Sequence, residues 1–323
     1  MGGIWSMVSL GIDYGTGSWK TALLGEGRLP ALRSFASSDE VRTYVREIEG
    51  RYPGLPIILP SGFGIPLKRV QELDDRDLFE IALRRESPSE RGLSRFLMAL
   101  RGSHLNAYCI PAVKLLPSVP IHRKVNRVDM GTSDKLCTVA FFMSQLHERG
   151  VRFESLDFLM LEVGLAFRAI VAVRAGKIVD GLGGTAGGIG PQCRGSIDGE
   201  LAYLYDWDTK ESIYHGGAQD IEARFGGYGH AAFWEGFEKD LLMFLQIHGL
   251  KTVLVAGRRK QEVSDRLGQR FQIEVLTEEN EGFEAATGAA ILADGIAGGR
   301  HAGLVTHLGL RDVTDRALDW IYR

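Results

Sequence analysis

The 323-residue chain is poor in cysteine and carries no cysteine motif. Cys109, Cys137 and Cys193 stand far apart, which excludes a disulfide framework and the paired spacing of zinc or iron–sulfur sites. The eight histidines show no H-x-x-x-H spacing for a metal. Isolated cysteines are typical of a reducing compartment, and we expect a cytoplasmic protein.

Long apolar runs and an excess of charge are also missing. No run reaches the roughly 18–20 residues that a membrane span needs, and no basic region precedes the short apolar stretch at the N-terminus, so a signal peptide is not expected. The formal net charge is −3, which gives no electrostatic reason to expect nucleic acid or an anionic membrane as a partner. With 45% hydrophobic and 24% charged residues, the composition is that of a globular protein of one to three domains.

The two commonest nucleotide-binding motifs are absent. The chain has no G-x-x-x-x-G-K-[ST], and no G-x-G-x-x-G between a strand and a helix. Glycine itself is frequent, with 41 residues, and it clusters at predicted turns where phosphate groups could sit.

The most informative feature is a repeat whose two copies lie 149 residues apart, as Asp13 and Glu162 do. The copies begin at residues 10 and 159. Each predicts an apolar strand, an acidic residue, a glycine turn and a second strand, and then a turn with a glycine and a basic residue that leads into a third strand. Two similar halves that face one another predict a cleft with a carboxylate on each side. Such a cleft can hold a metal-bound nucleotide, and a nucleotide phosphotransferase is therefore the leading hypothesis.

Strands alternate with helices along the chain, which predicts an α/β architecture with largely buried sheets. We predict strands at 8–13, 19–24, 28–35, 55–59, 107–110, 158–163, 167–173, 177–181, 252–256 and 273–276, and helices at 38–50, 75–85, 88–100, 132–149, 231–248, 258–268, 282–297 and 312–321. The helix that ends before Gly150 marks the boundary between the halves. The predicted domains are 1–131, with a less regular insertion near 61–104, a connecting helix at 132–150, and 151–323.

The first turn, residues 13–18, has the residues of a phosphate-binding loop. Its glycines let backbone N–H groups approach phosphate oxygens, and its hydroxyls add donors. Asp13 is placed to hold Mg²⁺ through water, and Lys20 to reach a terminal phosphate. An ordinary hairpin turn is the competing interpretation of this motif, and the second copy of the repeat weakens it.

Four further segments have a functional and a plain structural interpretation. Gly257 and Arg258 follow a strand, where small residues let a nucleoside lie against the backbone, although such turns are common. Gly288 lies in a small-residue helix that either approaches a nucleotide or packs on another helix. Arg194 either clamps an anion or is a surface arginine, and Asp129 is either a general base or a neighbour of the helix cap at Thr132.

With these residues in view, the chain resembles the acetate and sugar kinase/heat-shock chaperone/actin superfamily over nearly its whole length. Residues 13–18 resemble the first phosphate motif, 162–164 a degraded second phosphate motif, 255–258 the adenosine motif, and 282–297 the second connecting helix. The resemblance implies two duplicated actin-like (ribonuclease H-like) α/β domains with a nucleotide cleft between them. It also implies ATP and Mg²⁺ as the cofactors.

The nearest branch resembles the acetate and butyrate kinases, and within it an archaeal family labelled predicted butyrate kinase. Residues 131–135 resemble the branch's H-G-T-S-H-K segment and 176–180 its G-K-x-V-D turn. Residues 190–195 resemble its G-P-…-R-S-G loop, which puts Arg194 at the catalytic arginine. Residues 279–281 resemble its G-E-N-E segment, in which an acid, here Glu281, helps to hold Mg²⁺. A homodimer is common in this branch.

The chain departs from that branch on the acceptor side. Met130 stands where the branch has its transition-state histidine, the catalytic aspartate has no counterpart near residues 110–114, and Asp13 replaces an asparagine. Asp129, Lys114 or Arg123 could substitute. The nucleotide half of the machinery is therefore better supported than the acceptor half.

We accordingly predict an ATP- and Mg²⁺-dependent phosphotransferase that acts on a small anionic acceptor, a carboxylate before other classes. The alternatives are a small sugar or polyol kinase with Asp129 as its base, and a non-metabolic ATP-binding switch or ATPase of the same superfamily. The predicted catalytic residues are Arg194, Asp129 and Lys20. The predicted cofactor-binding residues are Asp13, Gly15, Thr16, Gly17, Ser18, Lys20, Gly164, Gly257, Arg258, Glu284 and Gly288, and the predicted metal ligands are Asp13 and Glu281.

Overall fold

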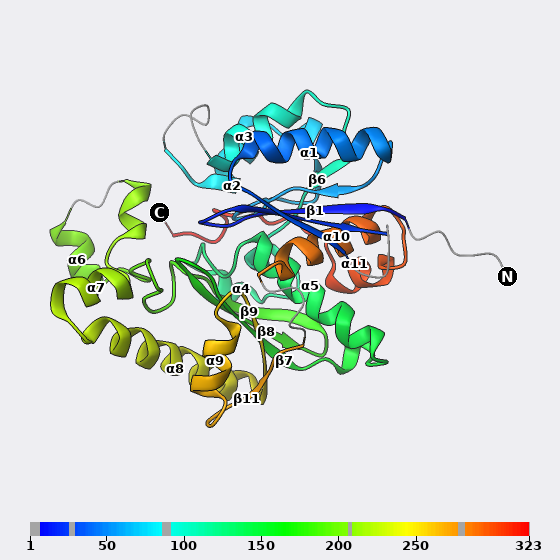
Figure 1. Cartoon of the computed structure of the whole chain (residues 1–323). Coiled ribbons are helices and arrows are strands. Elements are labelled where there is room, and N and C mark those ends of the chain that lie inside the picture. Colours follow the sequence, from blue (N-terminus) through cyan, green and yellow to red (C-terminus); the bar gives the residue numbers. More distant parts are fainter. Residues whose placement is uncertain (1–6, 26–29, 86–91, 206–208, 277–281, 323) are drawn as a thin grey trace.

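Two β-sheets with two helices between them make up the centre of the molecule (Figure 1). The computed structural model describes residues 7–25, 30–85, 92–205, 209–276 and 282–322. The first half carries a six-stranded sheet and the second half a five-stranded sheet. This arrangement confirms the predicted α/β fold of two actin-like halves.

The first sheet has the strand order β3-β2-β1-β4-β6-β5. Its strands are β1 (Ser9–Tyr14), β2 (Trp19–Leu24), β3 (Ala31–Phe35), β4 (Ile57–Ile58), β5 (Lys68–Arg69) and β6 (Ala107–Cys109). The second sheet has the order β11-β10-β7-β8-β9. Its strands are β7 (Phe158–Val163), β8 (Arg168–Arg174), β9 (Lys177–Leu182), β10 (Thr252–Ala256) and β11 (Gln272–Glu274).

The two sheets share one topology over five strands each, and the first sheet has β5 in addition, paired antiparallel to β6. In each, three antiparallel strands are followed by two strands parallel to the first one. The leading hairpins also close in the same way: the Gly15 N–H donates to the Ser18 carbonyl at 3.1 Å, and the Gly164 N–H to the Phe167 carbonyl at 2.9 Å. The 149-residue repeat is therefore a structural duplication, in which residue 13 corresponds to residue 162 and residue 18 to residue 167.

Most predicted helices are present within a few residues of their expected ends. The helices are α1 (Ser38–Arg51), α2 (Asp75–Ala82), α3 (Gly92–Arg101), α4 (Ile121–Lys124), α5 (Ser133–Glu148), α6 (Gly199–Leu204), α7 (Ala218–Phe225), α8 (Tyr228–His248), α9 (Lys260–Leu267), α10 (Glu284–Ile296) and α11 (Ala302–Leu308). Helix α1 begins where its sequence indicates, because the Ser37 hydroxyl accepts a hydrogen bond from the Glu40 N–H. No described helix is both long enough and apolar enough to cross a bilayer.

Helices α5 and α10 pack face to face between the sheets (Figure 1). A Cβ at Gly288 of α10 would lie 1.8 Å from the Cys137 carbonyl oxygen of α5, so the two helices touch backbone to backbone. On its other side α10 crosses β1, where a Cβ at Gly11 would lie 2.1 Å from the Ala286 carbonyl oxygen. The late helix α10 thus packs on the first sheet, and the domain limits at 131 and 150 remain a prediction.

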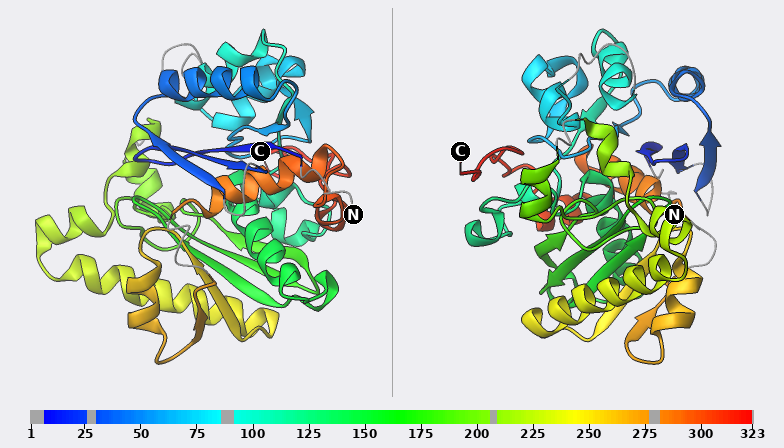
Figure 2. Two further views of the ribbon diagram at one scale, coloured as in Figure 1. Left: turned by 45° about the vertical axis from the view of Figure 1, so that its right-hand side comes forward. Right: turned by 90° about the vertical axis from the view of Figure 1, so that its left-hand side faces the viewer.

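Helices α6, α7 and the start of α8 project from the side of the second half, in yellow-green (Figure 2). The sequence did not predict α4, α6, α7 or α11. These are short helices, of 4, 6, 8 and 7 residues, and so few residues show little periodicity.

The helix predicted at 312–321 is wrong. These residues form turns instead, because other parts of the chain take up their backbone groups. The Lys114 ammonium, only 1% exposed, donates to the Ala317 and Asp319 carbonyls at 2.8 and 2.7 Å. These bonds hold the C-terminal segment against the first half of the chain.

Arg316 makes the strongest contact of this C-terminal segment. Its guanidinium binds Glu80 at 2.8 Å and Asp77 at 2.6 Å, and both carboxylates belong to helix α2 and are almost fully buried. Each carboxylate has one further cation: Lys68 lies 2.6 Å from Asp77, and Arg76 lies 2.9 Å from Glu80. The C-terminal segment therefore completes the charge balance of α2.

We predict that Arg316→Met lowers the free energy of unfolding by about 2–3 kcal/mol, because two buried carboxylates each lose one of their two cations. The comparison of urea midpoints with Arg300→Met is the control, since Arg300 pairs with Glu148 at 3.4 Å on the surface and its loss should cost less than about 0.5 kcal/mol. Equal midpoints for the two variants would contradict the prediction.

Candidate functional site

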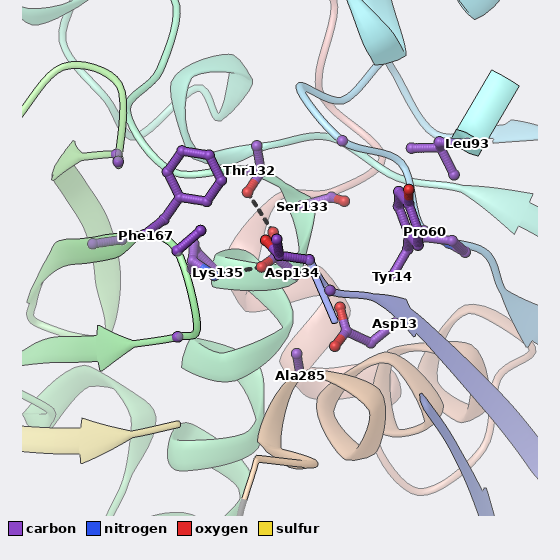
Figure 3. Close-up of a pocket in the computed structure, with 18 of the residues that line it drawn as sticks. Asp13, Tyr14, Pro60, Leu93, Thr132, Ser133, Asp134, Lys135, Phe167 and Ala285 are labelled. Carbon is purple, nitrogen blue, oxygen red and sulfur yellow. Dashed lines mark hydrogen bonds and ion pairs between the residues drawn. The ribbon is translucent and has the colours of Figure 1, made fainter. Parts of the chain in front are cut away.

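A cavity of about 500 Å³ lies where the two hairpin turns face each other (Figure 3). Loops from both halves line it. Of the predicted site residues, the cavity is lined by Asp13, Gly15, Thr16, Gly17, Ser18, Lys20, Asp129, Gly164, Gly257, Arg258 and Glu284. The structure thus brings together most of the residues chosen from the sequence, although their roles stay predictions.

The glycines of the two turns leave the backbone open to the cavity. A Cβ at Gly15 would have the Ser18 carbonyl oxygen as its nearest neighbour, at 3.6 Å, and a Cβ at Gly164 would have the Phe167 carbonyl oxygen, also at 3.6 Å. Neither glycine has the left-handed backbone that requires glycine. Since the fold itself accepts a methyl group at both positions, the missing side chains leave room for a ligand to approach the backbone of the turns.

Asp13 lies at the floor of the cavity with a carboxylate that is 9% exposed (Figure 3). No hydrogen bond to this carboxylate comes from the described residues. Burial and the neighbouring carboxylates of Asp134 and Glu162 raise the pKa of Asp13 to about 7, although Lys20 and Lys135 oppose the shift. The floor therefore carries an excess of acid that a bound cation would relieve.

Lys135 joins the start of α5 to the end of β7. Its ammonium contacts the Asp134 carboxylate and lies 2.7 Å from Glu162, whose other oxygen accepts from the Thr138 hydroxyl at 2.9 Å. Burial opposes the charged lysine, but Asp134 and Glu162 outweigh it and raise the pKa of Lys135. This ion-paired group sits directly between the two halves.

The predicted site did not include Asp134, Lys135 or Glu162. The repeat marks Glu162 as the counterpart of Asp13, and Lys135 belongs to the segment that resembles the kinase motif. Asp134 carries no signal of its own, because an acid in the first turn of a helix is common for reasons of helix stability. Only the position of α5 brings it into the cavity.

Lys20 and Arg258 connect the first hairpin to the second half. The Lys20 ammonium donates to the Gly282 carbonyl and lies 5.5 Å from the centre of the Phe283 ring. The Arg258 guanidinium donates to the Ser18 hydroxyl at 3.3 Å. Lys20 is therefore directed at the segment before α10, in the part of the cavity that Gly257 and Glu284 also line.

Gly257, Arg258 and Glu284, which the sequence assigns to the nucleotide, line that part of the cavity, and this role stays a prediction. Gly257 has a φ of +90°, and a Cβ there would lie 2.5 Å from the Val163 carbonyl oxygen, so this turn requires glycine. Glu284 begins α10 and is paired with Lys260 at 3.2 Å in a buried ion pair. Burial raises the pKa of Glu284, and Lys260 opposes the shift.

Asp129 anchors a neighbouring loop. One of its carboxylate oxygens accepts from the Thr185 N–H and hydroxyl at 2.9 and 2.7 Å, and the other accepts from the Gly131 N–H at 3.2 Å. A Cβ at Gly183 would lie 1.7 Å from the latter oxygen. A carboxylate with three donors suits a structural anchor better than a general base.

Arg194 and Gly288 lie away from the cavity lining. The Arg194 Nε donates to the carbonyls of Ser212 and His215 at 3.1 and 3.0 Å, so this arginine supports the short helix η4 (Lys210–Tyr214) instead of reaching the cavity. Gly288 serves the contact between α10 and α5 described above. The predicted metal ligand Glu281 lies outside the described residues.

Apart from the glycines and polar groups of the two turns, the cavity wall is mostly apolar. Its large side chains are Tyr14, Phe63, Ile81, Leu93, Leu165, Phe167, Ile213 and Tyr214, and its cations are Arg84 and Lys210. The Arg84 guanidinium lies 3.0 Å from the Glu211 carboxylate, and the Lys210 ammonium lies 4.9 Å from the Phe63 ring centre. Both contacts join the first half to η4 across the cavity mouth.

Solved structures with the same fold include two carboxylate kinases. Acetate kinase from Entamoeba histolytica matches with 8% identity and a TM-score of 0.55, over 80% of this chain and 86% of its own. A propionate kinase from Francisella tularensis subsp. tularensis SCHU S4 matches with 11% identity and a TM-score of 0.55, over 81% and 88%. A ROK family glucokinase from Streptomyces griseus, in complex with glucose and AMPPNP, matches at 14% identity and a TM-score of 0.46, over 88% and 98%.

At these identities the matches establish the fold, which is the two-domain actin-like fold of the superfamily that the motifs resemble. A comparison with curated protein sequences found no match. A match to one protein family, in contrast, covers residues 11–323. The chain belongs to the family described as protein of unknown function (DUF1464).

Proposed function

We propose that this protein is an ATP- and Mg²⁺-dependent kinase that phosphorylates a small carboxylate. The observation that carries the proposal is the pair of matching glycine turns at Gly15 and Gly164, which line one cavity and have no side chain between their backbone and a ligand. The Gly15 and Gly164 N–H groups close the turns themselves, so the N–H groups of the residues that follow them would be the donors to phosphate oxygens. The fold shared with acetate and propionate kinases supports the same class of reaction.

Asp13 suits a role beside a magnesium ion. It is a buried carboxylate that lacks a hydrogen-bond donor among the described residues, and burial together with its acidic neighbours raises its pKa to about 7. No three described acids, histidines or cysteines form a metal site by themselves. Magnesium in kinases is usually bound by one or two carboxylates together with substrate phosphates. The ion would be held by Asp13, with Glu281 as the second predicted ligand, and would supply neutralisation of charge on the phosphates.

Lys20, Arg258 and Glu284 would bind the nucleotide from the side of α10, and the hydroxyls of Thr16 and Ser18 would add donors to its phosphates. In the transfer step, a carboxylate oxygen of the acceptor bonds to the γ-phosphorus while the bond from this phosphorus to the β–γ bridging oxygen breaks. The products are an acyl phosphate and ADP. Closure of the two halves over the bound substrates would limit the access of water, which would otherwise compete as the acceptor.

The wall chemistry favours a carboxylate over a sugar. An ionised carboxylate needs no base, whereas an alcohol must lose a proton during transfer, and the predicted base Asp129 already accepts three hydrogen bonds. Sugar hydroxyls also need several polar partners, while this wall is dominated by apolar side chains. A sugar or polyol kinase remains the second candidate, because the buried Met130, 2% exposed, replaces the histidine of the acyl branch.

The direct test measures Mg·ATP consumption against a panel of small carboxylates and polyols, with hydroxylamine present to trap acyl phosphates. We expect a hydroxamate with at least one carboxylate. Phosphorylation of a polyol without hydroxamate would establish the second candidate. Nucleotide binding without turnover on any acceptor would favour the ATP-binding switch.

The phosphate turns can be tested one at a time by Gly15→Ala and Gly164→Ala. Each added methyl group enters the space of the ligand and not of the protein, so stability should be unchanged while the Kd for Mg·ATP rises about tenfold or more, the worth of about one hydrogen bond. Calorimetric titration measures the Kd. Gly50→Ala is the control, since a Cβ at this exposed helical glycine meets no atom within 4 Å; unchanged affinity in both turn variants would refute the phosphate cradle.

Asp129→Asn separates an anchor from a base. We expect a loss of about 1–3 kcal/mol in stability, because the amide places a donor where Thr185 and Gly131 now donate. Asp157→Asn is the matched control: Asp157 also accepts a backbone N–H, from Ala175 at 2.7 Å, but it is 53% exposed and should cost much less. Unchanged urea stability together with lost turnover would identify Asp129 as the base.

A further inference from the structure

The two hairpin turns have the same backbone but opposite side-chain chemistry. The duplication pairs Thr16 with Leu165 and Ser18 with Phe167. The first turn thus presents hydroxyls to the cavity, and the second presents an isobutyl group and an aromatic ring. The second turn therefore has no hydroxyl at these two positions, and it offers the cavity an apolar surface instead.

Phe167 is held in one orientation by its neighbours. Its ring lies edge to face with Tyr214 at 5.2 Å between ring centres. Gly184 makes room for it, since a Cβ there would lie 2.5 Å from the Phe167 ring. A ring positioned this firmly offers a preformed apolar surface, which keeps the entropic cost of binding low.

A second aromatic surface lies across the cavity. Figure 3 shows Phe167 and Tyr14 on opposite sides, with Thr132 and Asp134 between them. The Tyr14 ring is 42% exposed and is supported from behind by Trp19, at 4.3 Å between ring centres. Leu93 lies on the same side as Tyr14 (Figure 3).

Two cations also line the cavity. Arg84, which is paired with Glu211 at 3.0 Å, and Lys210 are both in the lining, where each can add a charged contact to an anionic ligand. Two aromatic side chains on opposite sides of the cavity favour a ligand with a planar ring, because ring pairs are worth more than the area they bury. A two-carbon acid would leave most of this surface uncovered.

We propose that the second turn, residues 164–167, has become the acceptor wall, and that with Tyr214 and Tyr14 it binds a carboxylate that carries an aromatic ring. The proposal rests on the proposed kinase function and specifies its acceptor. The carboxylate end faces the phosphate turns, where the transfer takes place. The ring lies between Phe167 and Tyr14.

The test uses the full-length protein with phenylacetate, butyrate and acetate as probes. In the hydroxamate assay we expect kcat/KM for phenylacetate to exceed that for either aliphatic acid by about tenfold or more, because the free energy gained by burying the ring is large enough for that ratio. A higher kcat/KM for butyrate or acetate would overturn the proposal and leave the kinase function intact.

The double variant Leu165→Thr/Phe167→Ser gives the second turn the side chains of the first. We expect kcat/KM for phenylacetate to fall about tenfold or more, with the Kd for ADP within about threefold of the parent value. Phe225→Ser is the matched control, since Phe225 lies on α7, is 60% exposed and is not among the residues of the cavity lining. An unchanged kcat/KM for phenylacetate in the double variant would overturn the proposal.

Calorimetry tests the aromatic acceptor wall separately from the kinase function. If no acceptor turns over, phenylacetate is titrated into the ADP-loaded protein: saturable binding that the double variant loses supports the aromatic wall, and absence of binding overturns it. If neither ADP nor ATP binds, the kinase function fails. Phenylacetate is then titrated into the protein alone, with the same two outcomes for the wall.

Discussion

The molecule depends on the close backbone contacts of helix α10. This helix lies between β1 and α5, and it reaches both because Gly11 and Gly288 have no side chains at the two crossings. The contact carries the segment from Gly282 to Glu284 to the first hairpin, where Lys20 donates to the Gly282 carbonyl. A side chain at either glycine would push the two halves apart and widen the cavity between them.

The duplicated hairpins explain how one fold unit can provide two different surfaces. Their hydrogen-bonded turns match residue for residue, so the same backbone lines the cavity from both sides. The side chains then differ: hydroxyls in the first turn and apolar groups in the second. Because the backbone alone maintains the turn, the side chains are free to diverge toward different parts of a substrate.

Charge within the cavity is arranged in partly neutralised pairs. Lys135 is shared by Asp134 and Glu162, and Lys260 is paired with Glu284. Asp13 is the exception, since its carboxylate has no hydrogen-bonding partner among the described residues and its pKa is raised to about 7. An unbalanced acid beside a glycine turn is what a cation-bound phosphate would complete.

Local patterns in the sequence determined ten of the eleven described strands, the repeat, the first turn with Asp13 and, to within two residues, the helices α1, α5 and α10, since each rests on the spacing of apolar residues or on a turn residue close by in the chain. The two-residue strand β5 was not predicted. The tertiary structure decided what depends on distant residues. It turned Arg194 toward the carbonyls of η4, brought Asp134 beside Asp13, and replaced the helix predicted at 312–321 by turns bound to Lys114. Contacts between side chains that are far apart in the sequence leave no periodic pattern in it. For that reason only the folded chain shows which groups meet in the cavity.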